Sequence, residues 1–171
     1  MKAEQGLQLA VEDMAAKVAE SVKDGAVVGL GSGATVAVFV KKLGRRVAEE
    51  RLSLSVIPSS LQIQLVAEEA GLNLVSPHMI PKIDMTVDGA DQVDEEFNVI
   101  KGGGGALYRE RVLLKAAKKS IILADEKKYV KHLSRAVPVE TSFFARSFVA
   151  RELAKIKGKP ALRFLDKGYP F

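Results

Sequence analysis

Short apolar runs alternate with longer segments of helical periodicity along most of the chain, and this alternation leaves few folds open. It is typical of a parallel sheet whose faces are covered by helices. We therefore predict an α/β fold with a parallel sheet and flanking helices. The predicted strands lie at residues 26–30, 54–57, 72–75, 83–87, 99–100 and 120–124. The predicted helices lie at residues 7–22, 35–51, 60–70 and 106–118.

The composition excludes several classes of protein. With 171 residues, 47% of them apolar and 27% charged, the chain is large enough to bury a core. It has no cysteine, so disulfides and thiolate metal sites are excluded. No apolar run reaches the roughly 18 residues that span a bilayer, and the first residues lack the apolar centre of a signal peptide. These features favour a cytoplasmic protein.

The pattern of the chain changes after residue 133. Residues 137–140 look extended, residues 142–157 helical and residues 161–164 strand-like. Such a piece is too small to form a core of its own, so it must pack on another domain, another subunit or further sequence. We predict a catalytic domain at residues 1–133 and an incomplete small domain at residues 134–171. The same reasoning predicts a homodimer or homotetramer.

Positive charge is concentrated towards the C-terminus. The net charge is +5, and residues 126–171 hold 11 basic against 4 acidic side chains. These charges recur at helical spacing between apolar residues, which is typical of a solvated amphipathic helix. We therefore expect neither a nucleic-acid partner nor a membrane.

Residues 29–35 (Gly-Leu-Gly-Ser-Gly-Ala-Thr) join a predicted strand to a predicted helix. Glycines allow a tight turn and a close approach to a ligand, and a helix N-terminus favours phosphate. A capped structural turn is the alternative. The spacing fits neither G-x-G-x-x-G nor a P-loop. The residues predicted to bind phosphate are Ser32, Gly33, Ala34 and Thr35.

A second turn, Asp88-Gly89-Ala90-Asp91, follows the predicted strand at residues 83–87. Its two carboxylates could face one pocket and bind sugar hydroxyls or accept a proton, although aspartate is also common in structural turns. Metal binding is not predicted, because the chain has only two histidines and both lie far away in sequence.

A third loop consists of Lys101 and four consecutive glycines, and Glu110 follows within the next predicted helix. Four glycines cost roughly a kcal/mol each in backbone entropy. That cost is explained if the backbone lies against a ligand or offers N–H groups to an oxyanion. The alternative for Glu110 is an exposed helical carboxylate paired with a basic neighbour. Lys128 follows the last predicted strand and could reach a phosphate, or could belong to a solvated charge run.

In this order, the motifs resemble ribose-5-phosphate isomerase A. The motifs concerned are the glycine loop, Ile57-Pro-Ser-Ser60, Asp-Gly-Ala-Asp91, Ile100-Lys-Gly-Gly-Gly-Gly-Ala-Leu, Arg109-Glu110, Ala124-Asp125 and Val137-Pro-Val-Glu140. The resemblance implies a Rossmann-like domain followed by a small α+β (ferredoxin-like) domain. It also implies interconversion of ribose 5-phosphate and ribulose 5-phosphate without metal or nucleotide, within the non-oxidative pentose phosphate pathway.

The resemblance implies specific roles as well. Glu110 is implied as the base that moves a proton between C2 and C1 through an enediolate. Asp88 or Asp91 would handle hydroxyl protons, and Lys101 would stabilise the enediolate oxygen. The implied substrate contacts are Ser32, Gly33, Ala34, Thr35, Asp88, Gly89, Ala90, Asp91, Lys101, Gly102, Gly103, Gly104 and Lys128.

The chain also departs from the family pattern. Ala34 stands where the glycine loop usually has a hydroxyl, and apolar Val11 aligns with a substrate-facing lysine. Family members continue beyond residue 171, so the sequence is expected to be a fragment. A non-catalytic sugar-phosphate sensing domain of DeoR type is the alternative function, and an acyl-CoA transferase-like enzyme is a weaker one. A sensor would need the phosphate loop but not the base.

Overall fold

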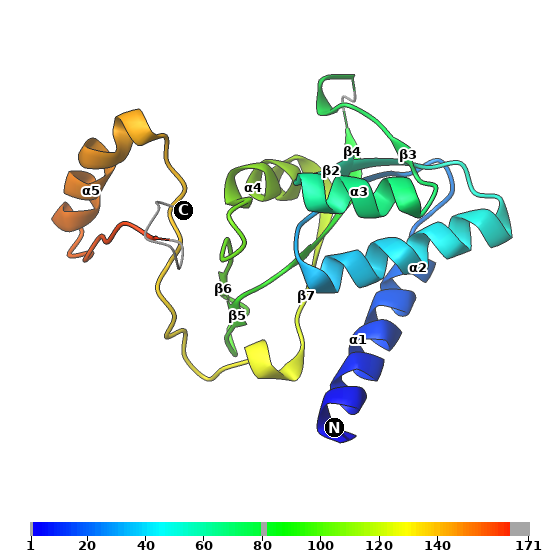
Figure 1. Cartoon of the computed structure of the whole chain (residues 1–171), viewed down its shortest axis with the longest axis horizontal. Coiled ribbons are helices and arrows are strands. Elements are labelled where there is room, and N and C mark those ends of the chain that lie inside the picture. The colour runs from blue at the N-terminus through cyan, green and yellow to red at the C-terminus, as the bar shows by residue number, and fades with distance from the viewer. Residues whose placement is uncertain (1, 80–81, 165–171) are drawn as a thin grey trace. The chain divides into compact units, whose positions relative to one another are not determined.

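The computed structural model describes residues 2–79 and 82–164. The chain divides into two compact units, with the boundary between Pro138 and Val139. The first unit contains a five-stranded sheet of order β3-β2-β1-β4-β7, in which all neighbouring strands are parallel. This architecture confirms the predicted α/β fold (Figure 1). The strands are β1 (Val27–Leu30), β2 (Ser55–Pro58), β3 (Asn73–Leu74), β4 (Ile83–Gly89) and β7 (Ala117–Leu123).

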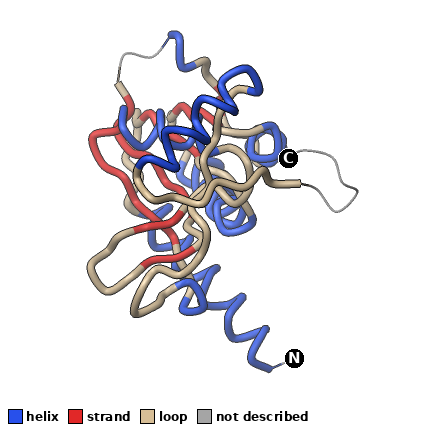
Figure 2. Tube along the Cα trace, turned by 90° about the vertical axis from the view of Figure 1, so that its left-hand side faces the viewer, coloured by secondary structure: helices blue, strands red, loops and turns tan. Residues whose placement is uncertain are grey.

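Helices cover both faces of this sheet. The larger core lies on one face, where buried side chains of α1, α2 and α3 meet those of β1, β2 and β4. The smaller core lies on the other face and contains Leu113 of α4 with Ile57 and Ile83. Figure 2 shows the same helices and strands from the side. The helices are α1 (Lys2–Glu20), α2 (Ala34–Glu50), α3 (Leu61–Glu69) and α4 (Leu107–Ala116).

The sequence predicts most boundaries to within a few residues, with one change of type. Residues 117–118, predicted as the end of a helix, begin strand β7. The reason is pairing, because Ala117 lies opposite Ile83 in the register of β4 and β7. Residues 99–100 form a strand as predicted, but β6 (Val99–Ile100) pairs antiparallel with β5 (Gln92–Val93) outside the main sheet.

In the second unit, α5 (Arg146–Lys155) follows a short 3₁₀ turn, Phe143–Ala145, so residues 142–157 are largely helical as predicted. The strand predicted at 161–164 is not among the sheet strands of the described residues. A strand must pair its backbone groups with a neighbour, and sequence periodicity does not reveal whether that neighbour is present. That this unit is an incomplete α+β domain remains a prediction. Within the described ranges, no helix is long and apolar enough to cross a membrane.

Close helix packing explains one glycine in α2. A Cβ atom at Gly44 would lie 2.5 Å from the carbonyl oxygen and 2.7 Å from the Cβ of Ala70, at the end of α3. Because the nearest atoms belong to backbone and to a short side chain, they cannot move aside easily. Gly6 of α1 has open space around its Cα instead, with nothing within 4 Å of a built Cβ.

Gly44→Ala is therefore expected to destabilise the protein by about 1–3 kcal/mol, because overpacking outweighs the gain in helix propensity. Gly6→Ala is the matched control and is expected to be neutral or to stabilise by up to about 1 kcal/mol. Urea unfolding followed by circular dichroism measures both. A Gly44→Ala variant as stable as the Gly6→Ala variant would contradict the packing argument.

Candidate active site

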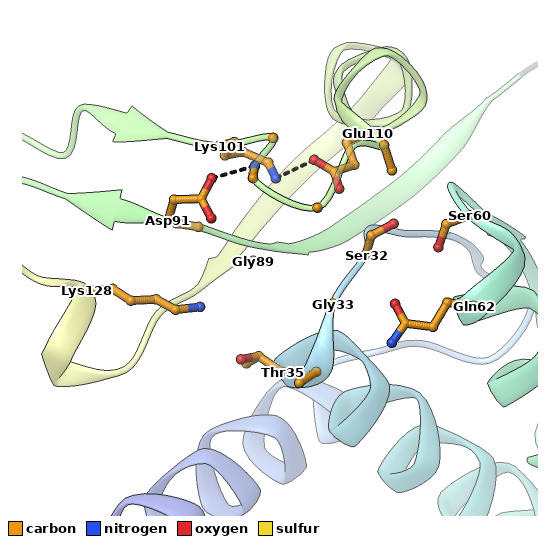
Figure 3. Close-up of a pocket in the computed structure, with 16 residues that line it drawn as sticks. Ser32, Gly33, Thr35, Ser60, Gln62, Gly89, Asp91, Lys101, Glu110 and Lys128 are labelled. Carbon is orange, nitrogen blue, oxygen red and sulfur yellow. Dashed lines mark hydrogen bonds and ion pairs between the residues drawn. The ribbon is translucent and has the colours of Figure 1, made fainter. Parts of the chain in front are cut away.

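A cavity of about 260 Å³ opens at the carboxyl ends of the sheet strands (Figure 3). The loops that follow β1, β2, β4, β6 and β7 all contribute to its wall. This is where open parallel sheets place ligands, because the strand ends and helix N-termini meet there. Its lining residues are Ser32, Gly33, Ala34, Thr35, Ser60, Gln62, Gly89, Ala90, Asp91, Lys101, Gly102, Gly103, Gly104, Ala106, Glu110 and Lys128.

The glycine loop after β1 forms one wall of the cavity. Gly33 has φ of 98°, a left-handed conformation that favours glycine, and it directly precedes α2. No side chain caps this helix. Its first backbone N–H groups therefore have no intrahelical partner, and the positive end of the helix dipole lies at the cavity. Such a wall suits an anionic group.

Two other glycines of this motif serve internal packing. A Cβ at Gly31 would collide with the side chain of Asp88, and a Cβ at Gly29 would collide with that of Thr86. Neither glycine has a positive φ or lines the cavity. The sequence suggested that glycines here let the backbone approach a ligand, but at these two positions the close neighbours belong to strand β4 and, for Gly29, also to Leu113 of α4.

Asp88 lies beneath the cavity rather than in its wall. Its side chain is fully buried and is absent from the lining. Oδ1 accepts hydrogen bonds from the backbone N–H groups of Gly89 at 2.7 Å and Ser32 at 3.3 Å. Oδ2 lies 2.8 Å from the Lys101 ammonium and forms an ion pair with it. Asp88 thus ties the end of β4 to the glycine loop and faces Lys101.

Lys101 joins two carboxylates at the edge of the cavity. Its Nζ lies 2.8 Å from Oδ2 of Asp88 and donates a hydrogen bond of 2.8 Å to Oε2 of Glu110. Glu110 is 97% buried and occupies the first turn of α4, on the face that also carries Leu113. Figure 3 shows the Glu110 and Lys101 side chains pointing towards each other. One ammonium is therefore shared by two buried carboxylates.

The surroundings change the pKa values of all three groups. Burial raises the pKa of Glu110 above its ordinary 4.5. The charges of Asp88 and Asp91 raise this pKa further, whereas Lys101 lowers it. Burial likewise raises the pKa of Asp88, against the Lys101 charge. Burial alone would lower the pKa of Lys101, but the two neighbouring carboxylates raise it overall. Lys101 is consequently charged at neutral pH, and Glu110 is a stronger base than an exposed glutamate.

Asp91 and Lys128 complete the cavity. Oδ2 of Asp91 accepts a hydrogen bond of 2.7 Å from the backbone N–H of Gly103, which fixes the four-glycine loop against the turn after β4. Lys128 ends a 3₁₀ turn, Glu126–Lys128, that Asp125 caps by accepting a hydrogen bond from the N–H of Lys127. In Figure 3 the Lys128 ammonium reaches towards Thr35, across the cavity from Glu110.

Nearly all of the residues singled out from the sequence line this cavity, with Asp88 as the exception. Ser60, Gln62 and Ala106 line it without having been predicted to bind substrate. The signal for Ser60 was present, since it follows the strand end Ile57-Pro58 and caps α3 by accepting a hydrogen bond from the N–H of Ile63. In the described part of the chain, no three His, Asp or Glu side chains are grouped so that they could hold a metal ion.

Comparison with known proteins gives a consistent result. A family model described as ribose 5-phosphate isomerase A (phosphoriboisomerase A) matches residues 55–171. Ribose-5-phosphate isomerase A of Archaeoglobus fulgidus is 48% identical over 150 residues, which are 87% of this chain and 66% of that protein. The protein of the same name from Methanosarcina acetivorans is 44% identical over 142 residues, covering 83% of this chain and 61% of the relative.

A solved structure agrees with these relatives. Ribose 5-phosphate isomerase A from Methanocaldococcus jannaschii superposes with a TM-score of 0.85 at 34% identity, over 94% of this chain and 72% of that one. The chain spans less than two thirds of the length of the two curated relatives.

The triad of Asp88, Lys101 and Glu110 predicts opposite pKa changes for two variants. Lys101→Met removes the one group that lowers the pKa of Glu110, so that pKa is expected to rise further. Asp88→Asn removes a repelling charge, so the pKa of Glu110 is expected to fall. A pH titration followed by NMR of ¹³C-labelled glutamate side chains measures both. Lys115→Met, which removes an exposed lysine from the same helix, is the control and should leave this pKa unchanged. Changes of equal sign in the first two variants would contradict the coupling.

Proposed function

The chain belongs to the ribose 5-phosphate isomerase A family, and on that premise we propose that it interconverts ribose 5-phosphate and ribulose 5-phosphate. The observation that carries this proposal is the position of the Lys101 ammonium, 2.8 Å from the carboxylates of both Asp88 and Glu110. These groups lie beside a cavity whose glycine-loop wall suits an anionic group such as phosphate. The reaction belongs to the non-oxidative pentose phosphate pathway. We propose that it takes place in the cytoplasm, and the proposal assigns no role to a metal or another cofactor.

The phosphate is proposed to bind at the glycine-loop wall. The N-terminus of α2 offers unpaired N–H groups there, and the side chains of Ser32 and Thr35 add hydroxyls. Lys128 would neutralise part of the phosphate charge from the 3₁₀ turn. Ala34 contributes only its backbone N–H, because it lacks a hydroxyl.

The proton transfer is assigned to Glu110. Its carboxylate would remove the proton from C2 of the open-chain aldose, the electrons of that C–H bond would form the C1=C2 bond, and the carbonyl electrons would move to O1. A proton would then pass from the hydroxyl at C2 to O1, and Glu110 would return its proton to C1, leaving a carbonyl at C2. The raised pKa of Glu110 supports this role, because a base works best when its pKa lies near the working pH.

Lys101 and the backbone N–H groups of Gly102 and Gly104 would stabilise the negative charge that develops on the oxygens, since the N–H groups of Gly103 and Gly105 already donate to Asp91 and to the Gly102 carbonyl. Donors that are already oriented stabilise such a charge by several kcal/mol, since they need no reorganisation during the reaction. The exchange of hydroxyl protons, including those of ring opening, is assigned to Asp91 because its residue lines the cavity. Asp88 lies too deep for that role and would act by holding Lys101 charged and in place.

The Lys101–Glu110 pair favours the isomerase over a non-catalytic sugar-phosphate sensor. A sensor gains nothing from a buried base beside an ammonium, because burial of charged groups is costly and their pairing does not repay the whole cost. The glycine-loop wall alone would satisfy a sensor.

Glu110→Gln is expected to lower the rate of isomerisation by about 10²–10⁴-fold, the usual contribution of a general base, while binding of ribose 5-phosphate is retained. NMR in D₂O measures ketose formation and deuterium incorporation at C1, and calorimetry measures binding to the inactive variant. The matched control is Glu49→Gln, which neutralises an exposed glutamate of α2. Loss of binding together with activity would count against the assignment, as would full activity in Glu110→Gln.

We also propose that the protein assembles as a homodimer or homotetramer. Phe97 is 80% exposed and Tyr129 54% exposed, and together with Val99 they line a second, apolar hollow of about 450 Å³. A second copy of the chain could cover this apolar surface. Sedimentation velocity is expected to give a species of at least twice the chain mass, and Phe97→Ser is expected to shift it towards the monomer. A monomer at all concentrations would contradict this proposal.

A further inference from the structure

We propose that Thr86 is a positioning residue for Glu110. Its buried hydroxyl fixes helix α4 against strand β4, one helical turn away from the residue whose carboxylate contacts Lys101. The catalytic consequence rests on the proposed function, whereas the positioning itself does not. Thr86 is not part of the cavity wall and touches neither Lys101 nor Glu110 in any hydrogen bond or ion pair of the described residues.

The contact that carries the inference is a single long-range hydrogen bond. Oγ1 of Thr86 donates to the carbonyl oxygen of Leu113 at 3.0 Å, and both side chains are buried. The Leu113 carbonyl also accepts a hydrogen bond from the N–H of Ala117 at the end of the helix. The carbonyl therefore does not need the hydroxyl for its own satisfaction, and the hydroxyl adds a link between the helix and the sheet.

This hydrogen bond sets how helix α4 is positioned along strand β4. Thr86 and Asp88 are two residues apart on β4 and so point to the same face of the sheet. Glu110 and Leu113 are three residues apart on α4 and both lie on its buried face. Fixing Leu113 opposite Thr86 therefore sets where Glu110 lies relative to Asp88 and to the ammonium between them.

Two further observations support the same reading. No side chain caps the N-terminus of α4, so its first turn, which carries Glu110, is not held by a cap. The helix also lies very close to the sheet at this point. A Cβ at Gly29 of β1 would lie 3.2 Å from the Cβ of Thr86 and 3.3 Å from that of Leu113. The absent side chain at Gly29 lets the helix approach, and the hydroxyl then fixes its position along the strand.

The test compares two substitutions at one position. Thr86→Val keeps the shape of the side chain and removes the hydroxyl, whereas Thr86→Ser keeps the hydroxyl. If the helix loses its register, the contact between Lys101 and Glu110 lengthens. Displacements well below 1 Å in an active site already lower rates measurably, so we expect kcat of Thr86→Val to fall about tenfold with KM changed less than about twofold. Thr86→Ser is expected to restore kcat to within about threefold of the wild type.

The direction of the change in the pH profile separates a positioning role from loss of packing, because packing that admits water would lower the pKa of Glu110. Burial is the largest cause that raises the pKa of Glu110, the charges of Asp88 and Asp91 raise it further, and Lys101 lowers it. Arg109 and Arg111, on the same helix, are exposed. A weaker Lys101 contact should raise the pKa of Glu110 in Thr86→Val, and should shift the acidic limb of kcat to higher pH.

Ser120→Ala is the matched control. Its hydroxyl also donates to a carbonyl of α4, that of Leu114 at 2.9 Å, but from an exposed residue in the middle of the adjoining strand β7. It is expected to leave kcat and the pH profile unchanged. The inference is overturned if Thr86→Val keeps the wild-type kcat and the wild-type Glu110 pKa, or if Thr86→Ser loses as much activity as Thr86→Val.

The design separates this inference from the proposed function. If the wild-type chain produces no ribulose 5-phosphate, the proposed function fails, and the ¹³C titration of Glu110 alone then decides on Thr86. The positioning role is supported if the pKa of Glu110 is raised in Thr86→Val and has its wild-type value in Thr86→Ser. An unchanged pKa in Thr86→Val overturns it.

Discussion

The Lys101 ammonium between two buried carboxylates is the interaction on which the rest of the site depends. A single buried carboxylate without a partner would simply take up a proton, because burial penalises the charged form. Here two carboxylates share one cation, so the group as a whole keeps a net negative charge when all three are ionised. Burial raises the pKa values of both carboxyls, and the ammonium limits that rise. The balance leaves Glu110 protected from solvent, with a pKa above that of an exposed glutamate.

The fold brings these three charges together from segments that are separated along the chain. Asp88 lies next to the last residue of β4, Lys101 directly follows β6, and Glu110 lies in the first turn of α4. Two carboxylates at the site depend on a glycine without a side chain in the way, Asp88 on Gly31 and Asp91 on Gly103. The glycines of the motifs thus serve the assembly of the carboxylates as much as contact with a ligand. A side chain at either position would push the charged groups apart before any substrate arrived.

The sequence predicted the sheet well, because parallel strands buried on both faces read as apolar runs separated by helical periodicity. It also predicted the cavity wall, since loops at the carboxyl ends of neighbouring parallel strands must meet at one edge. It did not reveal that Asp88 lies beneath the cavity, because a turn motif specifies the residue but not the depth of its side chain. It assigned residues 117–118 to a helix, because the pairing of Ala117 with Ile83 depends on a segment more than thirty residues earlier in the chain. Thr86 carried no signal at all, as a threonine in a β-branched run looks like an ordinary strand residue.

The charges around the cavity also give a bound phosphosugar a direction. On one side lie Asp88, Asp91 and Glu110 with a single ammonium among them, and this side repels a phosphate group. On the other side lie the uncapped N-terminus of α2 and Lys128, and both attract an anion (Figure 3). In the proposed reaction, the phosphate at C5 would be drawn away from Glu110, and the opposite end of the sugar, with C1 and C2, would face it. A uniformly positive cavity would bind phosphate more tightly but would lose this orientation, and it would lower the pKa of Glu110, the proposed base.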